Sequence, residues 1–297
     1  MLTTPIAIAQ ALMCAIDAGL ERLDAQLLLL HTLGKPDTAR AWLLAHDSDA
    51  LTPAERQRFE QLLRRRAAGE PLAYITGHKE FFSLDLEVDA RVLVPRPDTE
   101  TLVEWALAVL SVMAPISPID LGCDDGDVLD LGTGSGAVAL ALQHARSDLR
   151  VHALDASADA LQVAQANAQR LRLPVKFFAG SWLTAVRGRY RAIVTNPPYI
   201  ATSDLHLLDL VHEPMQALVS GADGLDDIRE IVNYAGLHLH AGGWLLLEHG
   251  YDQATSVRNL LSQAGFEKVQ SRRDLSGIER CSGGRTKQCD AGTKTGR

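Results

Sequence analysis

Hydrophobic positions divide the chain into parts with different periodicities. Residues 1–70 show only helical spacing, including an apolar run that stops at Gly34 and the sequence "TPAE" at 52–55, which offers an N-cap threonine, a proline at the first helical position and a glutamate two residues later. Residues 71–97 switch to aromatic and β-branched side chains with a break at Gly77. The pattern therefore predicts a small N-terminal helical domain followed by a hairpin linker.

From residue 98 to residue 280, short apolar runs alternate with stretches of helical spacing. This alternation predicts βαβ units that build a mostly parallel sheet with helices on both faces, an α/β fold. Residues 281–297 are polar and rich in glycine, and we expect them to form a flexible tail. The expected strands are 128–131, 151–154, 175–178, 192–195, 244–248 and 268–272, and the expected helices are 98–113, 136–146, 157–170, 225–239 and 252–264.

Composition narrows the class of protein. The 297 residues, 46% of them hydrophobic, are enough for two domains with full-sized cores. A net charge of −8 argues against a protein that binds a polyanion over a wide face, so no direct nucleic-acid substrate is expected. Apolar runs fall far short of the roughly 20 residues that cross a bilayer, so no membrane contact is expected. Cys14, Cys123, Cys281 and Cys289 share no metal-ligand spacing, which predicts no metal site and a reducing, cytoplasmic location.

The first candidate site is the glycine-rich turn in "VLDLGTGSGAVALAL". Ligands of parallel sheets bind beyond the carboxyl ends of the strands, and Gly132, Gly134 and Gly136 would let the backbone approach such a ligand closely. Asp155 ends the next expected strand, where its carboxylate could accept hydrogen bonds from two ribose hydroxyls, and Ser157 could cap the following helix. These residues predict a nucleoside cofactor. Because the turn also satisfies the dinucleotide pattern, an NAD-dependent oxidoreductase stays open at this point.

The second candidate site is "NPPY", directly after the expected strand at 192–195. The nitrogen of a planar amide is a poor nucleophile because its lone pair is delocalised. Asn196 Oδ1 and the carbonyl of Pro197 could accept both N–H hydrogens of such a group, while the two prolines hold these acceptors rigidly and Tyr199 lays its ring against the amide. The motif predicts methylation of a planar NH₂ group, and the alternative interpretation is a turn that terminates the strand.

Other polar residues are expected to support the site. Glu248 and His249, at a strand end, are interpreted as hydrogen-bonded scaffolding. Glu213 and Pro214 are expected to shape a substrate pocket, and Arg96 to lie in a loop over the cofactor. None of these five residues enters the predicted catalytic set.

Seven segments, in order, carry a resemblance to a known family. With the glycine turn they are "GEPLAYITGHKEFF", "VLVPRPDTETLVEWAL", "NPPYI", "EPMQAL", "GADGL" and "GGWLLLEHGYDQ". Over about residues 60–280 the chain resembles the HemK/PrmC family, the methyltransferases that modify the glutamine of peptide chain release factors. The resemblance implies a class I, Rossmann-like methyltransferase fold with a seven-stranded sheet at 98–280, S-adenosylmethionine as cofactor and a release factor as protein substrate. It also implies that residues 1–70 dock this substrate, whose Gly-Gly-Gln motif would be methylated on the glutamine amide nitrogen.

The resemblance also implies roles for single residues, including Trp182 at the adenine. The chain departs from the family in the acidic "DLGCDDGD" at 120–127, interpreted as a loop insertion, and in its continuation after Arg280. A DNA or RNA amino-methyltransferase and a binding module without activity are the other functions considered. The implied cofactor-binding set is Gly132, Thr133, Gly134, Ser135, Gly136, Asp155, Trp182 and Asn196; the substrate-binding set is Asn196, Pro197, Pro198 and Tyr199; the catalytic set is Asn196, Pro197 and Tyr199.

Overall fold

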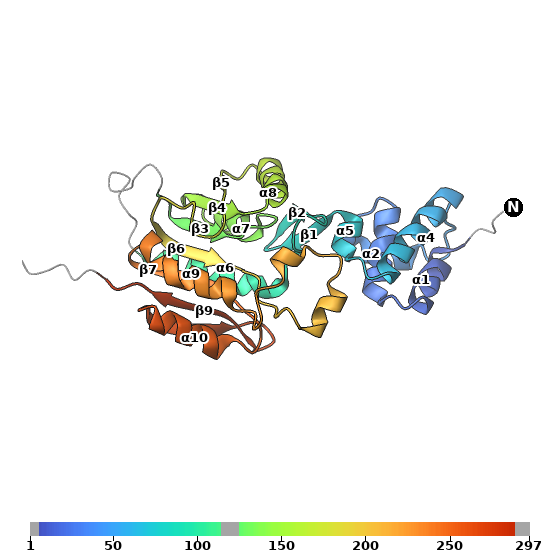
Figure 1. The fold of residues 1–297 in the computed structure, drawn as a ribbon. Helices are drawn as coiled ribbons and strands as arrows, with labels where there is room; N and C mark the ends of the chain where they lie inside the picture. The colour runs from blue at the N-terminus through green and yellow to red at the C-terminus, as the bar shows by residue number, and fades with distance from the viewer. Residues whose placement is uncertain (1–5, 114–124, 289–297) are drawn as a thin grey trace, which may run out of the picture. The chain divides into compact units, whose positions relative to one another are not determined.

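The structure is a computed structural model that describes residues 6–113 and 125–288, and it divides into two compact units between His78 and Lys79 (Figure 1). The first unit is helical, as the apolar spacing predicted, and Leu28, Leu29 and Phe59 are among its buried side chains. Its helices are α1 (Ile8–Asp17), α2 (Arg22–Thr32), α3 (Arg40–Ala45), α4 (Pro53–Ala67) and α5 (Leu72–Thr76).

The capping signal in "TPAE" is confirmed at the start of α4. The backbone N–H of Glu55 donates to Thr52 Oγ1 at 3.2 Å, and the backbone N–H of Thr52 donates to Glu55 Oε2 at 2.8 Å. The two residues thus satisfy each other's free donors, which is the reciprocal arrangement that stabilises helix starts. Within the parts of the chain that the structure describes, no helix is both long and apolar enough to span a membrane.

The expected hairpin is shorter than the predicted linker at 71–97. Strands β1 (His78–Phe81) and β2 (Leu84–Glu87) pair with each other, but the preceding residues form the helix α5. The reason is local, because α5 begins after Pro71 and ends at Gly77, whose left-handed backbone (φ +82°) closes helices readily. Aromatic and β-branched content alone did not distinguish this short helix from a strand.

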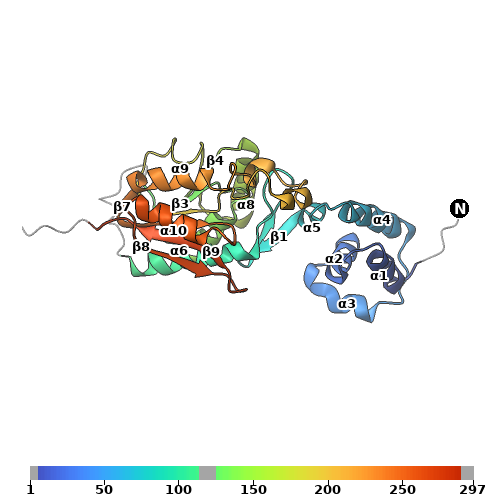
Figure 2. The same cartoon turned by 60° about the horizontal axis from the view of Figure 1, so that its bottom comes forward.

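The second unit contains a seven-stranded sheet in the order β5-β4-β3-β6-β7-β9-β8. All neighbours pair in parallel except β9, which is antiparallel to β7 and to β8. Helices α6, α7 and α8 pack on one face of the sheet, and α9 and α10 cover the other (Figures 1 and 2). The strands are β3 (Val128–Leu131), β4 (Val151–Asp155), β5 (Lys176–Ala179), β6 (Tyr190–Thr195), β7 (Leu239–Glu248), β8 (Glu267–Arg273) and β9 (Glu279–Arg285); the helices are α6 (Glu100–Val112), α7 (Ala137–Ala145), α8 (Ala158–Leu171), α9 (Asp226–Ala235) and α10 (Ala254–Gln263).

The prediction of a flexible tail at 281–297 is wrong for its first residues. Strand β9 lies between β7 and β8, and residues 281–285 all pair with β7, from Cys281 opposite Glu248 to Arg285 opposite Trp244. The sequence "CSGGR" carries no apolar signal because neighbouring residues occupy the space that side chains at its glycines would need. A Cβ on Gly283 would lie 2.6 Å from Leu246 Cδ2 and 3.0 Å from the ring of Trp105, and one on Gly284 would lie 2.7 Å from Phe266 Cβ. Residues 289–297 lie outside the described ranges.

The acidic segment at 120–127 is only partly described, since residues 120–124 fall outside the ranges above. Its last part is tied to the sheet. Asp125 accepts a hydrogen bond from the backbone N–H of Arg189 at 2.7 Å, and Asp127 pairs with the buried guanidinium of Arg191 at 3.0 Å. Asp127 therefore balances the charge of Arg191, while Asp125 binds the backbone just before β6.

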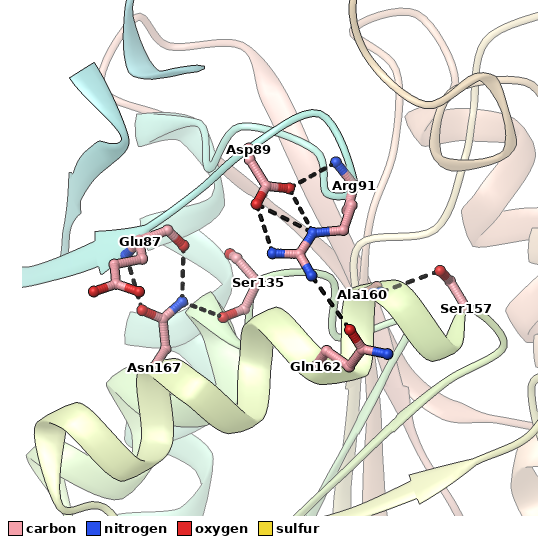
Figure 3. Close-up of polar contacts among 8 residues, drawn as sticks. All are labelled: Glu87, Asp89, Arg91, Ser135, Ser157, Ala160, Gln162 and Asn167. Carbon is pink, nitrogen blue, oxygen red and sulfur yellow. Dashed lines mark hydrogen bonds and ion pairs between the residues drawn. The ribbon is translucent and has the colours of Figure 1, made fainter. Parts of the chain in front are cut away.

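One side chain of α8 joins the hairpin to the glycine turn (Figure 3). Asn167 is fully buried, and its Oδ1 accepts from the backbone N–H of Glu87 at 2.8 Å. Its Nδ2 donates to the carbonyl of Glu87 at 2.9 Å and to the carbonyl of Ser135 at 3.0 Å. Asn167 therefore fixes β2 and the turn after β3 relative to α8, through one buried hydrogen bond to Ser135 and two partly buried ones to Glu87.

We expect Asn167→Leu to destabilise the second unit by about 2–4 kcal/mol, because it strands buried backbone groups that each cost roughly 1–3 kcal/mol when unsatisfied. The control is Gln162→Ala, an exposed position on the same helix, where a change within about 0.5 kcal/mol is expected. Urea unfolding followed by tryptophan fluorescence measures both. Equal midpoints for the two variants would show that Asn167 has no special structural role.

Candidate active site

A cavity of about 470 Å³ lies at the carboxyl ends of the central strands, where the sequence predicted a ligand. Its volume falls in the range of roughly 300–1,000 Å³ that is usual for small-molecule sites. Successive strands supply its walls: Gly132 and Gly134 follow β3, Asp155 ends β4, Trp182 follows β5 and Asn196 follows β6. The structure therefore brings together five residues of the predicted cofactor set.

The glycine turn is shaped by close contact with a tryptophan. Gly132 has a left-handed backbone (φ +69°), and a Cβ placed there would lie 3.2 Å from the ring of Trp182. Trp182 itself is held in a left-handed conformation (φ +41°), and its Nε1 donates to Asp227 Oδ1 at 2.8 Å. A strained backbone and a fixed indole N–H hold the ring as a rigid wall of the cavity.

Asp155 is oriented by backbone donors. Its Oδ2 accepts from the N–H of Gly134 at 2.9 Å, and its Oδ1 accepts from the N–H of Ser157 at 2.8 Å. Each oxygen has further acceptor capacity, so the carboxylate can still receive two hydroxyl groups from the cavity side. The predicted capping role of Ser157 is confirmed, since its Oγ accepts from the N–H of Ala160 at 3.1 Å at the start of α8.

Three residues of the predicted cofactor set do not line the cavity. Thr133 instead donates from Oγ1 to the buried Asp130 at 2.7 Å, and the carbonyl of Ser135 accepts from Asn167. Gly136 is the N-cap of α7, with φ +86°. These residues shape the turn, while Gly132 and Gly134 face the ligand space.

Asp130 is a residue that motif reasoning missed. It is 2% exposed on β3, and besides Thr133 it accepts a hydrogen bond from the N–H of Ala139 at 3.2 Å, which ties the strand to α7. Burial raises the pKa of Asp130 to about 7, with the hydrogen bonds opposing the rise. The sequence feature that could have identified Asp130 is its position as a single acid within an apolar strand, two residues before Gly132.

A second, smaller cavity of about 70 Å³ adjoins the first, and the two share Leu93, Asn196 and Ala217 as lining residues. Tyr199 lines only the smaller cavity and Pro198 only the larger one. Asn196 therefore lies at the wall between them. Of the predicted substrate set only Pro197 is not among the lining residues of either cavity, and it is buried.

The amide of Asn196 is held by a residue far away in sequence. Its Nδ2 donates to Oγ1 of Thr99 at 3.3 Å, and Thr99 is 4% exposed at the turn before α6. This contact directs Oδ1 of Asn196 to the opposite side of the amide, where it accepts no hydrogen bond from the described residues. Thr99 was not predicted as a site residue, because it lies outside both motifs and 97 positions before Asn196 in the sequence.

Tyr199 is held by hydrogen bonds at its side-chain hydroxyl and at its backbone carbonyl. Its hydroxyl donates to Glu248 Oε1 at 3.3 Å, and its backbone carbonyl accepts from Gln253 Nε2 at 3.0 Å. Gly224 allows this path of the backbone, since a Cβ there would lie 2.2 Å from the same carbonyl. Burial raises the pKa of the Tyr199 hydroxyl above its usual value, so the phenol stays protonated.

Glu248 and His249 are buried and hydrogen-bonded, as was expected of residues that support the site. The His249 ring is fully buried, with Nδ1 2.8 Å from the carbonyl of Gly250 and Nε2 2.8 Å from Ser282 Oγ. Glu248 is 1% exposed, and burial raises its pKa to about 7, although the hydroxyls of Thr99 and Tyr199 oppose this rise. The carboxyl of Glu248 therefore keeps its proton to a higher pH than an exposed glutamate does.

Glu213 fastens the loop that precedes α6. It is 5% exposed, accepts from the backbone N–H of Val94 at 3.1 Å and forms an ion pair with Arg96. Arg96 lines the smaller cavity, whereas it was expected over the cofactor, and Pro214 lines the larger one.

Comparisons with known proteins agree on the family. Residues 7–77 match the model of the PrmC N-terminal domain, and residues 116–225 match that of the methyltransferase small domain. A release factor glutamine methyltransferase of Bordetella pertussis is 48% identical over 272 residues, which cover 90% of this chain and 96% of the relative. One of Pseudomonas aeruginosa is also 48% identical, over 89% of this chain and 92% of the relative. The chain belongs to the release factor glutamine methyltransferase family.

Solved structures confirm the class I, Rossmann-like methyltransferase fold. The catalytic domain of hMettl16, crystallised with hairpin 6 of the MAT2A 3′UTR, has a TM-score of 0.55 at 16% identity and covers 78% of this chain and 84% of that one. A methyltransferase from Pyrococcus furiosus has a TM-score of 0.50 at 18% identity, covering 78% and 98%. At these identities the likeness concerns the fold alone.

The larger cavity of this family member fits S-adenosylmethionine, which carries a ribose, an adenine and a cationic sulfur. Asp155 supplies acceptors suited to the ribose hydroxyls, and Trp182 a flat apolar wall. The charged side chains of the lining are Asp155, Asp227 and Arg91, and the Arg91 charge is matched by a forked pair with Asp89 (Figure 3). The lining therefore has a net negative charge, which favours a cation.

The raised pKa of Glu248 predicts how stability depends on pH. The unfolded carboxyl loses its proton near pH 4.5, whereas the folded one keeps it until about pH 7, so the free energy of unfolding falls as pH rises through this window and is level above it. Between pH 5 and pH 8 we expect the free energy of unfolding of the wild type to fall by about 2–3 kcal/mol relative to that of Glu248→Gln, whose side chain does not titrate. Because Asp130 titrates in both proteins, its contribution cancels. A constant difference across this range, measured by urea unfolding, would contradict the prediction.

Proposed function

We propose that this protein transfers the methyl group of S-adenosylmethionine to the side-chain amide nitrogen of the glutamine in the Gly-Gly-Gln motif of peptide chain release factors. The observation that carries the proposal is the position of Asn196, whose fixed amide lies between a cofactor-sized cavity and a smaller one lined by Tyr199. Membership of the family supports the same substrate. The larger cavity would hold the methyl donor and the smaller one the acceptor amide.

The donor cavity is arranged for binding. Asp155 would receive the ribose hydroxyls, Trp182 would pack against the adenine, and Gly132 and Gly134 would allow close approach of the backbone. When bound, S-adenosylmethionine supplies an electrophilic methyl group on a positively charged sulfur. The net negative lining contributes to binding that charge.

The acceptor cavity is arranged for orientation. Oδ1 of Asn196 and the carbonyl of Pro197 would accept the two N–H hydrogens of the glutamine amide, which localises electron density on the nitrogen and points it towards the donor cavity. Tyr199 forms a flat, uncharged wall because its phenol is buried and protonated. No general base is required before transfer, since the amide proton becomes acidic once nitrogen has begun to bond to carbon.

A nucleic-acid amino-methyltransferase is the second candidate, because it would use the same motif on an exocyclic base amine. The net charge of −8 favours a protein substrate instead, as polyanion binding relies on lysine and arginine. We also propose a cytoplasmic location, which the free thiols of Cys14 and Cys281 in the described chain support.

The decisive assay incubates the protein with labelled S-adenosylmethionine and, separately, a release factor, total RNA or duplex DNA. We expect label on the amide of the Gly-Gly-Gln glutamine alone, located by mass spectrometry. Replacing this glutamine by asparagine shortens the reach by one methylene and should cost about 100-fold, because misplacement by an ångström can have that effect. Replacement by glutamate removes the nitrogen and should abolish transfer. Label in nucleic acid with an unmodified release factor would establish the second candidate instead.

The role of Thr99 predicts a second result. Thr99→Val keeps the shape of the side chain but removes the hydroxyl that holds Nδ2 of Asn196, so we expect turnover to fall about 10-fold while the dissociation constant of S-adenosylmethionine stays unchanged. Thr99→Ser keeps the hydroxyl and should retain activity within a few-fold. Asn196→Ala sets the scale, with a loss of about 100-fold. If valine and serine at position 99 behaved alike, the orienting role would be refuted.

A further inference from the structure

The segment directly after "NPPY" forms an ordered arch at the acceptor cavity, and we call residues 201–218 the rim segment (gold in Figure 1, between β6 and α9). It contains two short 3₁₀ turns, Leu205–Asp209 and Met215–Ala217. The residues that flank it pair with each other, as Ile200 and Val219 form a parallel bridge. The N–H of Ile200 donates to Leu218 at 2.9 Å, which fixes the two ends of the arch together.

The rim segment is also fastened in its middle. Glu213 is 5% exposed and holds both Val94 and Arg96, which lie in the loop before α6. The inner residues Leu210 and Ala217 line the acceptor cavity. A buried carboxylate with two partners cannot leave its place cheaply, so the outer face of the segment is presented in a defined conformation.

Four large apolar side chains of the rim segment are exposed, among exposed polar residues such as His206 and Asp209. Leu205 is 78% exposed, Leu208 71%, Val211 66% and Met215 51%, all within eleven positions. Single exposed apolar side chains are ordinary, but a group of four beside a substrate cavity is typical of an interaction surface.

The charge of the rim segment limits what can bind there. It contains no lysine or arginine, and its acids are Asp204, Asp209 and Glu213. Glu213 matches the charge of Arg96, which leaves Asp204 and Asp209 as the net charge of the surface when its histidines are neutral. Phosphate backbones are bound by lysine and arginine, so this surface disfavours nucleic acid and favours a protein whose contact region is apolar and neutral or basic.

We propose that the rim segment is the surface on which the release factor docks, with Leu208 and Val211 packing against apolar residues that flank the acceptor glutamine. The inference rests on the proposed function and adds to it the location and chemistry of the contact. A side chain can enter the cavity lined by Tyr199 only if the chain that carries it passes close to the residues of that cavity, and the rim segment supplies three of them, Leu210, Ala217 and Leu218. Docking and chemistry thus use opposite faces of one segment.

The test is the steady-state kinetics of the double variant Leu208→Ser and Val211→Ser on a release factor. Loss of two apolar contacts should raise KM for the release factor roughly 10- to 100-fold, whereas kcat and the dissociation constant of S-adenosylmethionine should stay within two- to three-fold. The matched control is Leu237→Ser, an equally exposed position (65%) just before β7, at the opposite end of that strand from the site. Thermal unfolding should show that both variants are as stable as the wild type.

The outcomes separate the two proposals. A wild-type protein that methylates nucleic acid and leaves the release factor unmodified would overturn the proposed function. If the wild type methylates the release factor but the double variant has the same KM as Leu237→Ser, docking on the rim segment is refuted and the function stands. A fall in kcat with unchanged KM would also refute docking, because the segment would then act on the chemistry.

Discussion

The parallel register of β3, β4 and β6 is the constraint on which the site depends. Backbone hydrogen bonds place Leu131 level with Leu154 on one side and with Thr195 on the other. The residues that follow, including Asp155 and Asn196, must therefore emerge at the same edge of the sheet, however distant they are in sequence. The side chains at this edge could be replaced without moving the strand ends, because only backbone groups form the hydrogen bonds that align β3, β4 and β6.

A second layer of buried polar groups turns this edge into a site of fixed geometry. Asp130 connects the glycine turn to α7. At the two ends of "NPPY", Thr99 contacts Asn196 and Glu248 contacts Tyr199. A buried ionised carboxylate would be costly, and burial raises the pKa of both acids towards neutrality, so each can remain in place as a partly neutral hydrogen-bonding group. Such groups orient the neighbouring site residues by hydrogen bonds without placing full negative charges beside them.

The sequence predicted features whose chemistry is local and missed those that depend on folding. The glycine turn, Asp155 and "NPPY" could be recognised because each requires particular residues at adjacent positions. Thr99 could not, since it meets Asn196 only through the packing of the turn before α6 against the end of β6. Strand β9 was missed for a related reason: its polar, glycine-rich sequence is buried because β7, β8 and the ring of Trp105 surround it.

An enzyme that modifies a protein side chain needs a rigid pocket and an accessible contact surface. The rim segment would have to serve both, although exposed apolar side chains contribute nothing to holding its cavity-lining residues in place. Glu213 resolves the conflict here. Its buried carboxylate holds Val94 and Arg96, and so fastens the rim segment to the loop before α6. Apolar side chains can then be exposed on the outside without loosening the cavity inside. If the release factor docks on these side chains, the apolar part of the contact would depend little on salt, while Asp204 and Asp209 would act against acidic partners.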